Sequence, residues 1–226
     1  MIRESDRIAV GVSGGKDSLA LLDALLLLQK RSPVAFEVEA FTVEQGKFLA
    51  PIAPMQEHMD DRGVRWTYYR DDPSFQLLEE QPEHGCDMCS RYRRRAVYDI
   101  ASQLGANVVA LGHTADDFCE SLLRNAMFTG RLSALPAVTN SRSGEFRLIR
   151  PLVFTSEEIT SGYAEEKGIR LTPCVCRTGP EPCVARCVVS RRDARGQPPR
   201  LREFAVRDGP HRHGAFARQT LPGQRR

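Results

Sequence analysis

The sequence predicts an α/β fold, a doubly wound and mainly parallel sheet, from three observations. Short apolar segments alternate along the chain with longer segments of helical periodicity. The first apolar segment turns through Gly14 and Gly15 directly into a helix. Three of the apolar segments end in polar or glycine-containing stretches, and sheets of this kind bind ligands beyond the carboxyl ends of their strands.

Five segments have the apolar or alternating pattern of strands. They are residues 7–12, 34–43, 64–69, 107–111 and 146–149. The stretches that follow or end the first, second and fourth strands are residues 13–15, 42–44 and 112–114. We expect these stretches to form one nucleotide site, with the phosphates at the first and the base nearer the second.

Six segments have the apolar periodicity and end signals of helices. They are residues 16–29, 54–62, 73–80, 90–104, 115–128 and 156–167. Gly168 is predicted as a left-handed cap of the last helix. A loop is expected to deliver Cys86 and Cys89 just before the fourth helix.

Length and composition indicate one α/β domain with an appendage. The chain has 226 residues, of which 41% are hydrophobic, and no apolar run approaches the ~20 residues that cross a bilayer. The first residues do not have the pattern of a signal peptide, so we expect a cytoplasmic protein without a membrane partner.

The charge is distributed unevenly along the chain. Residues 177–226 contain twelve arginines, no lysine and four acidic residues, a net charge of +8, whereas the first 176 residues carry −5 of the total +3. Apolar periodicity also ends after Thr178. We therefore expect a catalytic domain over residues 1–176 and a basic, disordered tail over residues 177–226, or a terminus altered by a change of reading frame.

The run Ser13-Gly14-Gly15-Lys16-Asp17-Ser18 predicts a phosphate-binding loop. Free backbone N–H groups and the helix dipole favour an anion there, while both serine hydroxyls and Lys16 add donors and charge. Val10 and Asp17 stand where a Walker loop needs a glycine and a Ser or Thr, and the dinucleotide glycine pattern also fails. The alternative is an ordinary glycine turn.

Seven cysteines in a cytosolic chain favour metal, cluster or sulfur chemistry over disulfides. Cys86 and Cys89 form a C-x-x-C pair, and Cys174 and Cys176 form a C-x-C pair. Four cysteine ligands would make a closed zinc site, and three would leave one iron of an iron–sulfur cluster open. The spacing does not decide between them, and an unreactive pair at a helix start is the third alternative.

Two further groups of residues can contact ligands. Asp116 and Asp117 open a helix after Gly112 and His113, where they could hold Mg²⁺ or cap the helix, while His113 could stabilise phosphate charge. A cluster of basic residues beside the cysteines suits RNA phosphates, with a solvated helix face as the alternative. Its members are Arg91, Arg93, Arg94 and Arg95.

Taken in order, these motifs resemble the tRNA 2-thiocytidine synthetase family within the ATP pyrophosphatases that insert sulfur into tRNA. The similarity covers about residues 5–177 and includes Arg150-Pro151-Leu152 and Pro173-Cys174, although Glu44 replaces the usual aspartate. It implies an adenine nucleotide alpha hydrolase-like (PP-loop) fold that uses ATP and Mg²⁺. It also implies a 4Fe-4S cluster on three residues, Cys86, Cys89 and Cys174.

The resemblance implies adenylation of a cytidine C2 oxygen in the anticodon loop, followed by attack of sulfur at C2. The implied catalytic residues are Lys16, Asp17, His113, Asp116 and Asp117. The implied nucleotide-binding residues are Ser13, Gly14, Gly15, Lys16, Asp17, Ser18, Thr42, Gly112 and His113. Arg91, Arg93 and Arg94 are expected to contact tRNA.

The expected partners are tRNA and a sulfur donor such as a cysteine desulfurase, and a homodimer is left open. Two other functions also remain. One is another ATP pyrophosphatase that acts on tRNA, similar to lysidine synthetase. The other is a nucleotide-binding protein without catalysis, in which four cysteines hold a structural zinc.

Overall fold

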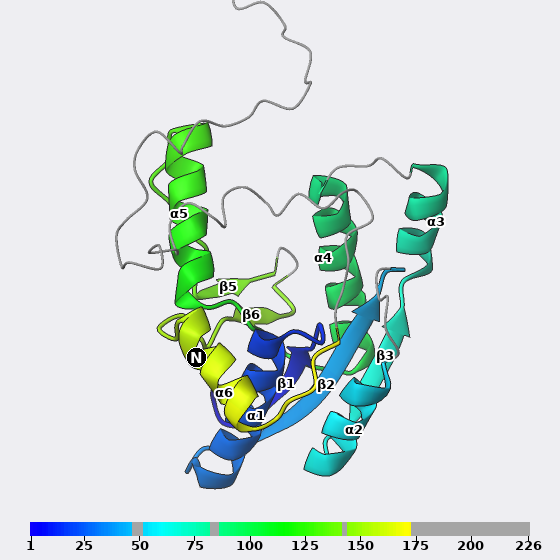
Figure 1. Cartoon of the computed structure of the whole chain (residues 1–226), viewed down its shortest axis with the longest axis vertical. Helices are drawn as coiled ribbons and strands as arrows, with labels where there is room; N and C mark the ends of the chain where they lie inside the picture. Colours follow the sequence, from blue (N-terminus) through cyan, green and yellow to red (C-terminus); the bar gives the residue numbers. More distant parts are fainter. Residues whose placement is uncertain (47–51, 82–85, 142–143, 173–226) are drawn as a thin grey trace, which may run out of the picture. The chain divides into compact units, whose positions relative to one another are not determined.

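The computed structural model describes residues 1–46, 52–81, 86–141 and 144–172, which form the helices and strands drawn in Figure 1. The strands are β1 (Asp6–Gly11), β2 (Phe36–Glu44), β3 (Trp66–Arg70), β4 (Val108–Leu111), β5 (Val138–Asn140) and β6 (Arg147–Ile149). The helices are α1 (Lys16–Arg31), α2 (Ala53–Arg62), α3 (Asp72–Glu80), α4 (Cys86–Gln103), α5 (Ala115–Thr129) and α6 (Glu157–Glu166). The predicted tail lies outside the described residues.

The six described strands form one sheet in the order β3-β2-β1-β4-β6-β5. All neighbours are parallel except β5 and β6, which pair antiparallel. The order reverses between β1 and β4, and this is the point at which such sheets bind ligands. The prediction of a doubly wound, mainly parallel sheet is therefore confirmed, and the five predicted strands are all present.

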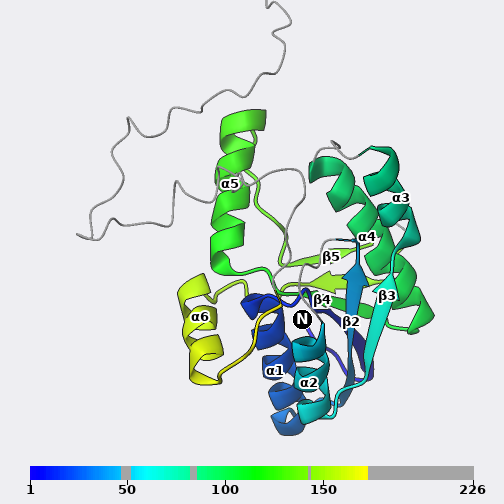
Figure 2. The same cartoon turned by 45° about the vertical axis from the view of Figure 1, so that its right-hand side comes forward.

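Helices cover both faces of the sheet, as Figures 1 and 2 show from two directions. On one face, Ile8 and Val10 of β1 pack with leucines of α1 and with Met55 and Met59 of α2. On the other face, the intervening residue Ala9 packs with residues of α4 such as Ile100. This alternation along β1 follows from the two-residue period of a strand and explains why Ile8, Ala9 and Val10 are all apolar.

The start of α4 differs from the sequence-based expectation. The helix begins at Cys86 rather than at Ser90, so both cysteines of the C-x-x-C pair belong to its first turn. Asp87 and Met88 are compatible with a helix, and an acidic residue in a first turn is stabilised by the helix dipole. The predicted left-handed conformation of Gly168 after α6 is confirmed, with φ +59°.

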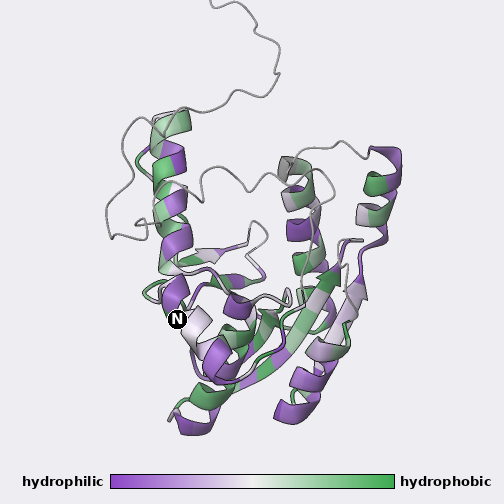
Figure 3. Ribbon diagram, viewed as in Figure 1, coloured by the Kyte–Doolittle hydropathy of each residue, from purple (hydrophilic) through white to green (hydrophobic). Residues whose placement is uncertain are grey.

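Helix α5 extends away from the sheet and has no buried residue. Figure 3 shows hydrophobic residues along its length, and the side chains of Met127 and Phe128 are 63% and 68% exposed. Among the described helices, none combines the length and the apolar character that a membrane span requires.

A buried carboxylate joins α1, α2 and α6. The carboxylate of Asp23 accepts hydrogen bonds from Arg62 (Nη2, 2.7 Å) and from the Tyr163 hydroxyl (2.9 Å), and lies 3.1 Å from His58 Nε2. Burial by itself raises the pKa of Asp23, but the hydrogen bonds with His58, Arg62 and Tyr163 outweigh it and hold the pKa at about 2. This carboxylate therefore fixes the position of α6, which reaches the site described below.

We expect Asp23→Asn to lower the free energy of unfolding by about 2 kcal/mol at pH 7, because the pKa of Asp23 is lowered from 3.8 to about 2 in the folded chain. The ionised group stabilises the fold above pH 4, and its contribution falls between pH 4 and pH 2. Urea unfolding at pH 7 and pH 3 measures this. Asp60→Asn, at an exposed position of α2, is the control, and equal acid sensitivity of the two variants would contradict the prediction.

Candidate functional site

The predicted phosphate loop connects β1 to the N-terminus of α1. Gly14 has φ +81°, a conformation that suits glycine, and Gly15 is the N-cap residue of α1. The Ser18 hydroxyl accepts from the backbone N–H of Ser13 (3.1 Å) and donates to the carbonyl of Gly15 (2.8 Å), so it fixes the shape of the loop. The first N–H groups of α1 have no acceptor within the helix and face the end of the loop.

The three strand ends singled out in the sequence lie together. A Cβ atom on Gly112 would come within 3.0 Å of the backbone of Asp17 and Ser18, so the turn after β4 rests directly on the first turn of α1. The Thr42 hydroxyl at the end of β2 donates to the carbonyl of Val12 (2.8 Å). The fold therefore brings residues 13–15, 42–44 and 112–114 to one edge of the sheet, as expected.

The Thr42 side chain has a role inside the fold. It is buried, and besides donating to Val12 its hydroxyl accepts from Trp66 Nε1 (3.0 Å). Both hydrogen bonds hold the end of β2 against the phosphate loop. The geometry therefore supports a role for Thr42 in shaping the phosphate loop.

Lys16 and Asp17 are linked to α6. Lys16 Nζ lies 2.8 Å from Asp17 Oδ1 and 3.7 Å from Glu157 Oε2, and the Thr160 hydroxyl donates to Asp17 (2.5 Å). Thr160 and Glu157 were not predicted as site residues, because helical periodicity in α6 does not reveal which residues meet α1, some 140 positions earlier in the chain. The basic group and the carboxylate are held in place at the start of α1.

Asp116 and Asp117 cap helices. Asp117 accepts from the backbone N–H of Thr114 (2.8 Å) at the start of α5, and Asp116 accepts from the backbone N–H of Glu157 (2.7 Å) at the start of α6. Both aspartates therefore cap helices, which is one of the two roles expected for them. The contacts also place two carboxylates near the phosphate loop. The described residues contain no group of three or more His, Cys, Asp or Glu side chains arranged to hold a metal ion, so Mg²⁺ at these carboxylates stays a prediction.

The surroundings of His113 disfavour its charged form. Burial lowers the pKa of His113, the charge of Arg150 lowers it further, Asp117 raises it, and Arg93 lowers it. Its Nδ1 atom is buried and has no hydrogen-bond partner among the described residues. A buried nitrogen without a partner at the edge of a nucleotide site is positioned to contact a ligand.

The cysteine pair and the path toward Cys174 are described in part. Cys89 is buried in the first turn of α4, whereas Cys174 lies outside the described residues. The backbone N–H of Thr172, two residues before Cys174, donates to the carbonyl of Gly14 (3.0 Å). Thr172, the last described residue before the predicted cluster ligand Cys174, is therefore hydrogen-bonded to the phosphate loop.

The predicted RNA-binding arginines lie on α4 beside a pocket of about 1000 Å³. Arg91, Arg93 and Arg94 are exposed, and Arg93 Nε donates to Gln45 Oε1 (3.2 Å) at the end of β2. Arg95 is paired with the buried Asp71 (2.5 Å) and serves the packing of α4. Arg95 belongs to the basic cluster but not to the residues expected to contact tRNA, and its ion pair with Asp71 gives it a role inside the fold.

A mainly parallel sheet whose first strand leads through a glycine loop into a helix N-terminus defines an α/β nucleotide-binding domain. The chain belongs to the PP-loop domain family, because the sequence model of this family matches residues 2–172.

Relatives agree with the resemblance to tRNA thiolation enzymes. The chain is 38% identical over 185 residues to a protein of Alkalilimnicola ehrlichii named tRNA-cytidine(32) 2-sulfurtransferase, covering 80% of this chain and 59% of that protein. It is 38% identical over 192 residues to a protein of the same name from Deinococcus radiodurans, covering 84% and 64%. The chain therefore spans about three fifths of the length of these relatives.

A solved structure shares the fold. The U34-tRNA thiolase NcsA from Methanococcus maripaludis, solved with its 4Fe-4S cluster, superimposes with a TM-score of 0.60 at 20% identity. The superposition covers 80% of this chain and 61% of that one. This likeness concerns the fold, which confirms the expected architecture.

Proposed function

We propose that the chain catalyses ATP-dependent thiolation of tRNA, replacing the C2 oxygen of cytidine 32 in the anticodon loop with sulfur. The observation that carries the proposal is the meeting of the phosphate loop, the His113 turn and Thr172 at one edge of the sheet. The relatives named tRNA-cytidine(32) 2-sulfurtransferase support the choice of nucleotide and of reaction.

In this proposal ATP is bound by the loop after β1. The backbone N–H groups of Gly14, Gly15 and Lys16 donate to phosphate oxygens, and Lys16 Nζ neutralises charge there. Attack of the cytidine C2 oxygen on the α-phosphate forms an adenylated tRNA and releases pyrophosphate, which turns a poor leaving group into AMP. His113, whose charged form is disfavoured, would donate or accept a hydrogen bond at the nucleotide, and phosphates together with carboxylates near the loop would hold Mg²⁺.

Three cysteine residues would hold the cluster that presents sulfur. Cys86 and Cys89 are three residues apart in the first turn of α4, and residues so spaced share one face of a helix, where the dipole stabilises thiolates. With Cys174, two residues beyond Thr172, their three thiolates would hold a 4Fe-4S cluster and leave one iron without a protein ligand. When bound, the cluster would present sulfur for attack on C2.

The proposal includes partners and boundaries. The substrates are tRNA and ATP, and a sulfur-donating protein such as a cysteine desulfurase supplies the sulfur. We assign the chemistry to residues 1–176 in the cytoplasm. The tail over residues 177–226 and the homodimer stay predictions that size-exclusion chromatography and NMR of the whole chain would examine.

Mass spectrometry of tRNA nucleosides tests the function. We expect 2-thiocytidine to be missing from a strain that lacks the protein, to return when the chain is supplied, and to fall about a hundredfold when Lys16→Ala is supplied, because the charge beside the phosphates is lost. Lys30→Ala, at the other end of α1, is the matched control. Unchanged 2-thiocytidine in the deletion strain would refute the proposal.

A further inference from the structure

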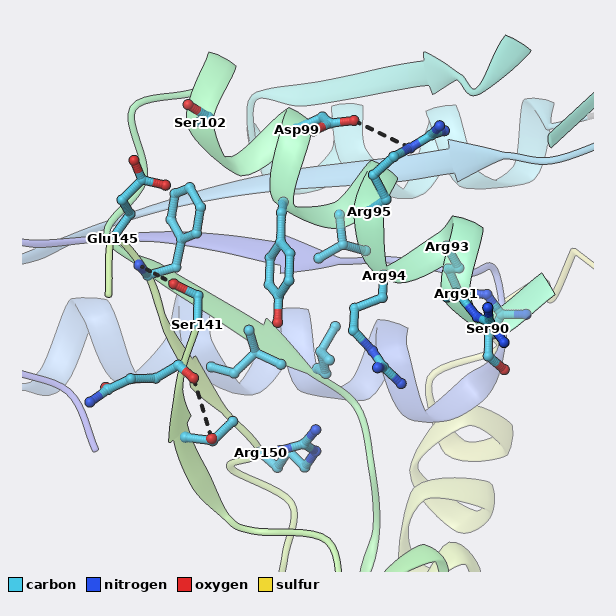
Figure 4. A pocket seen from close by; sticks show the side chains of 17 residues that line it. Ser90, Arg91, Arg93, Arg94, Arg95, Asp99, Ser102, Ser141, Glu145 and Arg150 are labelled. Carbon is cyan, nitrogen blue, oxygen red and sulfur yellow. Dashed lines mark hydrogen bonds and ion pairs between the residues drawn. The ribbon is translucent and has the colours of Figure 1, made fainter. Parts of the chain in front are cut away.

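The pocket beside α4 is a second candidate site, and the end of it that contains Arg150 lies at the carboxyl edge of the sheet. It lies between α4 and the strands β5 and β6, and Figure 4 shows the side chains that line it. Five arginines line the pocket, against two acidic residues. The arginines are Arg91, Arg93, Arg94, Arg95 and Arg150, and the acids are Asp99 and Glu145.

Arg150 is a buried cation that forms no ion pair with the described residues. Arg150 comes directly after β6 in the chain and is only 7% exposed. Its Nη1 donates to the carbonyl of Pro136 (2.6 Å). Its Nε is buried without a hydrogen-bond partner, and the described residues provide no ion pair to its guanidinium. Burying a charge in this way is unfavourable unless an anion accompanies it. Burial lowers the pKa of Arg150, Tyr98 raises it, and the charge of Arg94 lowers it.

Arg94 adds a second charge at the same place. Figure 4 shows its side chain pointing from α4 toward the side of the pocket that holds Arg150. Within the described part of the chain Arg94 makes no ion pair, whereas Arg95, its neighbour, is occupied by Asp71 and Asp99. Asp99 therefore pairs with Arg95 and not with Arg94. Two guanidinium groups that repel each other are brought together where a shared anion would stabilise both.

The place of the pocket in the sheet separates it from the phosphate loop. Leu111 of β4 lies opposite Arg150 in the continued register of β4 and β6, so Arg150 and His113 follow adjacent strand ends. In the order β1-β4-β6, Arg150 is two strands, about 10 Å, from the end of β1. The exposed arginines of α4 continue from the pocket to the surface, as the backbone of a long polyanion would require.

We propose that Arg150 and Arg94 bind a phosphate group of the RNA backbone next to the nucleotide that is thiolated. The guanidinium fork matches phosphate oxygens, and the buried Arg150 fixes the position of the backbone while Arg94 closes over it. This inference rests on the proposed function and adds to it the residues that position the RNA relative to ATP.

Binding measurements with the full-length chain test the inference. The probe is an unmodified tRNA transcript with a cytidine at position 32, and its affinity is measured at several salt concentrations for wild type, Arg94→Ala, Arg150→Met and Arg31→Ala. We expect Arg94→Ala and Arg150→Met each to bind the transcript about tenfold more weakly. The slope of log affinity against log salt should decrease in magnitude by about 0.7, the value for one single-strand phosphate contact. ATP affinity stays unchanged, and Arg31→Ala, at the far end of α1, behaves as wild type.

Each other outcome overturns the inference. Loss of ATP affinity with unchanged tRNA affinity would assign the pocket to the nucleotide. Unchanged tRNA affinity in folded variants would remove any role in RNA binding. Arg94 is exposed, so Arg94→Ala decides the matter even where thermal unfolding shows that Arg150→Met is not folded. A wild-type chain that binds no tRNA would refute the proposed function itself, and the RNA phosphate with it.

Discussion

Replacing Gly14 by alanine is expected to weaken ATP binding about a hundredfold, as measured by titration calorimetry. Gly14 has φ +81°, where an L-residue costs about 1–2 kcal/mol. An added Cβ would also lie 2.9 Å from both Cβ and the carbonyl oxygen of Thr172, and 3.1 Å from Met55 Sδ. Thr172 must then move away from the loop, which breaks its hydrogen bond to the Gly14 carbonyl and alters the direction of the N–H groups that receive phosphate.

Gly63→Ala is the matched control for this prediction. Gly63, after α2, has φ +60°, but a Cβ there would meet nothing within 4 Å. This variant should carry the same backbone strain, about 1–2 kcal/mol in urea unfolding, and keep its ATP affinity. If Gly14→Ala bound ATP as tightly as Gly63→Ala, the assignment of residues 13–18 as the phosphate site would be wrong.

Replacing Cys89 or Cys174 by alanine is expected to abolish thiolation and to remove iron and acid-labile sulfide from anaerobically purified protein. The loss should reach background in nucleoside mass spectrometry, because two cysteines do not hold the cluster that the proposal requires. Cys86→Ala should behave in the same way. Iron with sulfide in the wild-type chain supports a cluster, whereas one zinc per chain supports the structural alternative.

The control for the cysteine variants is Cys119→Ala. Cys119 is exposed on α5, so this variant should retain iron and activity. Cys89 is buried, and Cys89→Ser, which keeps the volume, separates loss of ligation from loss of packing when its unfolding is measured. Full activity of Cys174→Ala would refute the three-cysteine assignment.

The order of helices and strands could be predicted because each long element carries its own pattern. Helix α1 has a continuous apolar face, and β1 is apolar from Ile8 to Val10. Strand β5 was missed, since its three residues are at most partly buried and pair only at the edge of the sheet. Helix α4 began earlier than predicted, because a C-x-x-C motif does not by itself interrupt a helix.

The candidate site could be predicted in part. Ser13 to Ser18 and the turn at Gly112 stood out because glycines and small polar residues at strand ends have few other uses. Thr160 did not stand out, because a threonine in a helix is common in every fold, and Arg150 stood out only as part of the Arg150-Pro151-Leu152 motif, with no role assigned to it. Their partners come from elements distant in sequence, and only the packing of α6 on α1 and of β6 beside β4 brings them together.

The sequence by itself determined the class of fold, the phosphate loop and the family resemblance, because these depend on short-range patterns: apolar periodicity, glycines at turns and the spacing of cysteines. The tertiary structure decided which functional groups are engaged and which are left without partners. Asp116 and Asp117 cap helices, Thr42 supports the loop, and Arg150 is buried without an ion-pair partner among the described residues. The physical reason is that hydrogen bonding, burial and charge balance depend on neighbours in space, which the order of residues along the chain does not specify.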